Sequence, residues 1–175
     1  MIKMGVSPAY FISKYGDDFS PSDVISSIPH LKDEGYNCFQ IEIRYPDAVT
    51  YWDRFSIESL NHTCRDYGMY VSQFVCHHWM DHLSNSSQIL MPFDIEFIER
   101  TLAIADQLPG CQQVTVPLAK GIVDFELDPV GFDRIQVTLI ERLSFLLSKI
   151  KYHGKKMAIE LQPGAFINGT DGYLQ

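Results

Sequence analysis

At 175 residues the chain is long enough for one domain with a real core and short for two, so we expect residues 1–175 to form a single domain. Apolar residues make up 46% of it and charged residues 21%, as in ordinary soluble proteins, and no run of about 18 apolar residues indicates a membrane span. The formal net charge of -8 comes without a basic cluster, so neither nucleic acid nor a membrane is an expected partner.

Short apolar runs alternate with longer amphipathic segments along the chain. The runs predict β-strands at 2–6, 38–43, 70–75, 113–116 and 157–161. The amphipathic segments predict helices over about 20–34, 53–67, 94–108 and 128–152. Ser20 before Pro21 is a good helix start, and Gly68 is a good helix stop. In the second and third helices, Phe55 and Ile95 are expected on the buried face.

Strict alternation of strand and helix indicates a parallel sheet with right-handed crossovers. The connections from helix to strand are short and those from strand to helix are long, which favours an α/β fold of the TIM type, a (β/α) barrel. A complete barrel needs at least about 200 residues, so we expect about five of the eight βα units. A doubly wound sheet is the alternative, although no glycine-rich nucleotide motif follows any strand.

An incomplete barrel has consequences for assembly. Five strands would leave two unpaired sheet edges and an exposed apolar interior. We therefore expect either further units beyond those seen here or pairing of half-barrels, and hence a homo-oligomer. The four cysteines, Cys38, Cys64, Cys76 and Cys111, lack C-x-x-C spacing, which fits reduced, buried thiols in a cytoplasmic protein.

The last strand carries the strongest candidate for chemistry. Met157, Ala158 and Ile159 suit a strand covered on both faces, and Glu160 then places a carboxylate at its carboxyl end. Parallel sheets bind metals and substrates at that edge. Glu160 could therefore be a ligand or a base, or else a solvated strand end or an ion-pair partner. Gln162 follows it as a candidate substrate contact.

The second and third strands also end in polar residues. Glu42 shares a strand face with Gln40 and Arg44, so it either contacts substrate or forms a buried ion pair with Arg44. His77 and His78 should point apart, and we expect His77 to face substrate or metal. Trp79 could stack on a sugar face or cap the barrel rim.

Short motifs in a fixed order resemble the sugar phosphate isomerase/epimerase family, the xylose isomerase-like TIM barrels that include endonuclease IV-type enzymes. They are Lys3–Ser7, Phe39–Glu42, Val75–His77, and Ala158–Glu160 followed by Pro163-Gly164. The resemblance covers only the first five βα units of the family. It implies a divalent metal (Mn, Mg, Co or Zn) held by a strand-five Glu and by Asp, His and Glu of later strands.

The same resemblance implies an enzyme that moves a proton between adjacent carbons of a small sugar or sugar phosphate. Glu160 matches the strand-five Glu, as metal ligand and catalytic residue. His77 matches a strand-three His that contacts substrate or, in the nuclease branch, metal, and Glu42 matches a strand-two Glu. Because the later ligands are missing, the chain alone should bind metal weakly. Two alternatives remain: a self-associating half-barrel without catalysis, and an endonuclease IV-like phosphodiesterase. The net charge of -8 argues against the phosphodiesterase.

Overall fold

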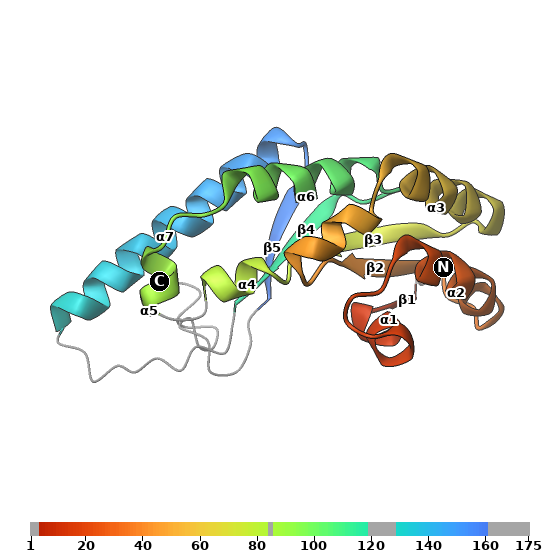
Figure 1. Ribbon diagram of the computed structural model, residues 1–175, viewed down its shortest axis with the longest axis horizontal. Helices are drawn as coiled ribbons and strands as arrows, with labels where there is room; N and C mark the ends of the chain where they lie inside the picture. Colours follow the sequence, from red (N-terminus) through yellow and green to blue (C-terminus); the bar gives the residue numbers. More distant parts are fainter. Residues whose placement is uncertain (1–3, 84–85, 119–128, 161–175) are drawn as a thin grey trace.

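The computed structural model describes residues 4–83, 86–118 and 129–160 (Figure 1). Five strands are formed by β1 (Gly5–Val6), β2 (Cys38–Glu42), β3 (Tyr70–Val75), β4 (Gln113–Pro117) and β5 (Lys156–Glu160). The four predicted helices are α2 (Pro21–Asp33), α3 (Arg54–Tyr67), α6 (Ile95–Gln107) and α7 (Pro129–Tyr152). The predicted alternation of strand and helix is therefore confirmed over the described chain.

The strands form one sheet in the order β1-β2-β3-β4-β5, and every neighbouring pair is parallel. In a doubly wound sheet the order would reverse direction at a switch point, so this alternative is excluded. Strands that follow one another in sequence order are the arrangement of a (β/α) barrel. The five strands make an incomplete barrel, as predicted, and within the described chain β1 and β5 each pair on one side only.

The main helices begin and end where their capping residues predict. At the start of α2 the Ser20 amide donates to Asp23 Oδ2 over 2.8 Å, and the Ser56 amide donates to the Asp53 side chain at the start of α3 over 2.7 Å. These bonds satisfy amides that the first turn leaves free. Gly68 ends α3 in the left-handed region with φ 61°, which glycine adopts without a steric penalty.

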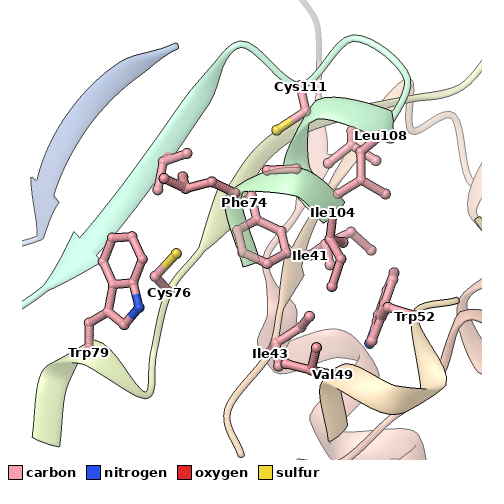
Figure 2. Packing of buried hydrophobic residues seen from close by; sticks show 14 of the residues in the cluster. Ile41, Ile43, Val49, Trp52, Phe74, Cys76, Trp79, Ile104, Leu108 and Cys111 are labelled. Carbon is pink, nitrogen blue, oxygen red and sulfur yellow. The ribbon is translucent and has the colours of Figure 1, made fainter. Parts of the chain in front are cut away.

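One face of the sheet is apolar and is covered by helices. Ile41, Phe74 and Val114 alternate out of three neighbouring strands into a continuous core, and Figure 1 shows α3, α6 and α7 along this side. Figure 2 shows Phe74 between the sheet and Ile104 of α6. Two expected core positions are wrong, because Phe55 and Ile95 are exposed. Both lie in the first turn of their helices, where the buried face is set by residues further along.

The opposite face of the sheet, which would face the interior of a barrel, carries a row of polar side chains. The strand register aligns Gln40 with Gln73 and Gln113 with Lys156, and the Gln113 Nε2 donates to Gln73 Oε1 over 2.7 Å. The expectation of an exposed apolar interior is therefore wrong for this row. Amide side chains remain solvated at low cost, whereas a row of leucines would not.

The long connections after the strands contain short helices that were not predicted. They are α1 (Pro8–Tyr15), the 3₁₀ helix η1 (Pro46–Tyr51), α4 (Trp79–His82) and α5 (Ser86–Leu90). All four cysteines are free and buried, as expected. In the described part of the chain, no helix has both the length and the apolar character that crossing a bilayer requires.

Candidate functional site

A cavity of about 210 Å³ opens at the carboxyl edge of the sheet. Four elements bring polar groups to it: Ser7 follows β1, Glu42 ends β2, His77 follows β3, and Glu160 ends β5. The remaining lining residues are Pro8, Ala9, Ile12, Gln40 and Val75. The strand ends therefore bring Glu160, His77 and Glu42 together, although they are far apart in sequence.

Glu42 is a buried carboxylate whose closest charged neighbour is His77. Its side chain is 6% exposed, and its Oε1 lies 3.2 Å from His77 Nδ1. The distance is that of an ion pair, but the two groups are not aligned as a hydrogen bond, and Oε1 makes none with other described residues. The alternative pairing with Arg44 is wrong, because Arg44 lies beyond the end of β2 and pairs with Asp17 at 3.4 Å.

A tight turn after β3 separates the two adjacent histidines. The Trp79 amide donates to Cys76 O and the Met80 amide to His77 O, so the chain leaves the strand in a helical turn. His77 stays at the cavity with 20% of its side chain exposed. The His78 ring is buried against Phe97, with the ring centroids 4.0 Å apart.

Trp79 is directed into the core and not toward the cavity. Its side chain is 1% exposed, and Figure 2 shows the indole beside Cys76. The expected stacking surface is therefore absent from the described cavity lining, because α4 begins at this residue and turns its side chain inward. The rim-capping alternative describes its position better.

Glu160 is exposed at the last residue of β5. It sits opposite Pro117 in the strand register, and its main-chain oxygen accepts from the Leu118 amide over 3.0 Å. These main-chain contacts fix where the residue leaves the sheet, and Glu160 lines the cavity. Gln162 lies outside the described residues.

The family model for xylose isomerase-like TIM barrels matches residues 28–173. The chain belongs to this family. No curated protein matches the sequence. Among solved structures, the chain is similar to a xylose isomerase-like TIM barrel protein from Mycobacterium smegmatis in complex with magnesium, at 15% identity and TM-score 0.58, over 99% of this chain and 61% of that one.

A second similar structure is the probable 3-DHS dehydratase AsbF from Bacillus anthracis, involved in petrobactin synthesis. It shares 10% identity with TM-score 0.67, and the match covers 99% of this chain and 57% of that one. At these identities the likeness concerns the fold. This xylose isomerase-like chain spans about three fifths of the length of both structures.

The cavity of this xylose isomerase-like chain contains candidate metal ligands. Glu160, His77 and Glu42 are oxygen and nitrogen donors of the right chemistry. However, within residues 4–83, 86–118 and 129–160 no three His, Cys, Asp or Glu side chains are close enough to hold an ion. Glu42 and His77 face each other instead. The described residues by themselves therefore do not make a metal site.

One wall of the cavity was not anticipated from the sequence. Ile12 lines it from α1, a helix that sequence patterning did not reveal. A signal was present, because Ser7-Pro8 repeats the Ser20-Pro21 pattern that marks the start of α2. Together with Pro8, Ala9 and Val75, Ile12 makes up the apolar part of the cavity lining.

Proposed function

We propose that the chain contributes the N-terminal part of an isomerase or epimerase site that acts on a small sugar by proton transfer next to a carbonyl. The observation that carries the proposal is that Glu160, His77 and Glu42 line one cavity at the carboxyl edge of the sheet. In this proposal Glu160 is the base that removes the proton, and Glu42 and His77 contact the substrate. Gln162 stays a candidate substrate contact on sequence grounds.

The described lining of the cavity supports an uncharged substrate. The described lining contains two carboxylates and no Lys or Arg, so a phosphate group would meet repulsion without a cationic partner. The lining contains both apolar and polar residues, which suits the C–H and hydroxyl groups of a sugar. An uncharged sugar is thus favoured over its phosphate.

The proposal includes a divalent metal (Mn, Mg, Co or Zn), which the described residues alone do not hold. The similar Mycobacterium smegmatis protein was solved with magnesium. When bound, such an ion would polarise the substrate carbonyl. Glu160 would supply one ligand, and the others would come from outside the described residues.

The test is hydrogen exchange into substrate. The protein is incubated in D₂O with a panel of aldoses, ketoses and their phosphates, with each of the four metals, and loss of the proton next to the carbonyl is followed by NMR. Glu160→Gln keeps the shape but removes the base, and it should slow exchange by about 10²- to 10⁴-fold. Glu34→Gln, at an exposed helix end, is the matched control and should be unchanged.

Two results would remove the proposal. One is exchange in Glu160→Gln at the rate of the unchanged protein. The other is the absence of exchange with every sugar and metal, which would favour a non-catalytic half-barrel. That alternative is supported by the two sheet edges that pair on one side only in the described chain, and it predicts a dimer in sedimentation. Cleavage at apurinic sites would instead favour the endonuclease IV-like alternative.

A further inference from the structure

The two histidines that follow β3 lie in different surroundings. Burial lowers the pKa of His78 to about 3, against a weaker opposing effect of the Ile43 main chain. Neither of its ring nitrogens makes a hydrogen bond with the described residues. His78 is therefore neutral near pH 7 and is buried from solvent. Its adjacent residue, His77, is the one imidazole that lines the cavity in the described chain.

The position of Glu42 defines which ring nitrogen of His77 is available to substrate. Glu42 Oε1 lies 3.2 Å from Nδ1, so that nitrogen faces a carboxylate and is best occupied by a proton. The other nitrogen, Nε2, is then left for substrate. A base oriented by a third group is the arrangement that activates imidazoles in enzymes, and such contacts often align fully only when substrate binds.

The burial of Glu42 indicates that this contact is more than a surface ion pair. A carboxylate that is 6% exposed loses most of its hydration, which costs several kcal/mol unless a partner compensates. Its Oε1 makes no hydrogen bond with the described residues, and Arg44 is engaged by Asp17. His77 Nδ1 is thus the polar group that the described structure places against this carboxylate.

We infer that His77 is a second catalytic residue of the cavity, acting as proton donor and acceptor at the substrate carbonyl oxygen, and that Glu42 is the positioning residue that holds it. The inference rests on the proposed function. Glu160 takes the proton from the carbon next to the carbonyl, and that electron pair becomes the C=C bond of an enediol. The carbonyl π pair moves to oxygen, which takes the Nε2 proton of protonated His77 and leaves a neutral ring with its proton on Nδ1. Glu160 then gives its proton to the former carbonyl carbon, and Nε2 takes the proton of the hydroxyl on the neighbouring carbon, so both groups are restored with no oxidant or reductant.

Exchange kinetics test the catalytic role. His77→Gln should slow hydrogen exchange into substrate by about 10²-fold or more. That variant leaves the buried Glu42 carboxylate without its imidazole neighbour, so the double variant Glu42→Gln/His77→Gln, which replaces both side chains together, is measured beside it. His62→Gln, an exposed histidine of α3, is the control and should keep the full rate. Exchange within about twofold of normal in a folded double variant would overturn the inference.

A second measurement does not depend on activity. In ¹⁵N-labelled protein, the neutral His77 ring should carry its proton on Nδ1, assigned by the signals that His77→Gln removes. Glu42→Gln should shift the ring toward a mixture of tautomers, because an amide can accept or donate where a carboxylate only accepts. A ring protonated on Nε2, or a tautomer that Glu42→Gln leaves unchanged, would overturn the inference. Failure of every substrate would remove the proposed function, while the tautomer would still decide whether Glu42 holds His77.

Discussion

A charged cluster between α6 and the start of β5 should make the stability of this protein depend on pH. His153 lies at its centre, with Nδ1 2.5 Å from Asp106 Oδ2 and Nε2 3.2 Å from Glu99 Oε2. Lys149 approaches the same Glu99, and Lys155 approaches Asp106 at 3.2 Å. Because one imidazole bridges two carboxylates of α6, its protonation joins α6 to the segment between α7 and β5.

The sign of the effect follows from the direction of the shift. Burial lowers the pKa of His153, but the hydrogen bonds that its ring makes to Asp106 and Glu99 outweigh burial and hold this pKa above its ordinary value of 6.5. Protonated His153 therefore stabilises the folded chain fully below the unfolded pKa near 6.5, and this contribution is lost as pH rises through the higher folded pKa.

The magnitude follows from exposure. His153 is 13% exposed, but its two carboxylate partners are 39% and 40% exposed, so solvent screens each contact to about 0.2–1 kcal/mol. Two such contacts give about 0.4–2 kcal/mol. His153→Gln should therefore lower the free energy of unfolding by this amount at pH 5.5 and by less at pH 9.

Urea unfolding at both pH values measures the difference directly. His62→Gln is the matched control, because His62 makes a similar pair with Asp66 at 3.4 Å but is 70% exposed. That variant should change stability by no more than a few tenths of a kcal/mol at either pH. A penalty for His153→Gln that is equal at pH 5.5 and pH 9, or larger at pH 9, would refute the reasoning.

Two predictions concern the core on the helix side of the sheet. Phe74→Ala removes a fully buried ring between the sheet and α6 and should cost about 3–5 kcal/mol in urea unfolding, a large part of a typical total of about 5–15 kcal/mol; a loss below 1 kcal/mol would contradict this packing. The buried cysteines should resist a thiol reagent until urea unfolds the chain, since burial raises the pKa of Cys64 to about 12 and that of Cys76 well above its usual range. Rapid labelling of Cys64 or Cys76 in the native protein would contradict their burial.

The sequence was sufficient for the order of strands and helices because both depend on local signals. Capping at Ser20 and Asp53 and the stop at Gly68 depend on a few neighbouring residues, and all three are seen. Side-chain direction in a first helical turn is less local. Phe55 and Ile95 were placed inward by periodicity, but the buried stripe is set by later positions that contact the sheet, and both side chains are exposed.

In the candidate site, the positions of residues on a strand were predictable from strand alternation, whereas those of residues beyond the strand end were not. Alternation along β2 correctly put Glu42 on the same face as Gln40, and both line the cavity. The partner of Glu42 was not predictable, because Arg44 lies past the last strand residue and the chain there bends toward Asp17. The stacking alternative for Trp79 was wrong for a related reason, since α4 begins at that residue and its side chain is buried.

The polar row on the inner sheet face affects how the incomplete barrel should associate. If that face were apolar, its exposure to water would favour contact with any apolar partner. Gln40, Gln73 and Gln113 instead present amide groups, with one bond already made between two of them. Such a face gains little from indiscriminate apolar contact but accepts specific hydrogen bonds. Any drive to pair should therefore come from the edges of β1 and β5, each of which pairs on one side only in the described chain.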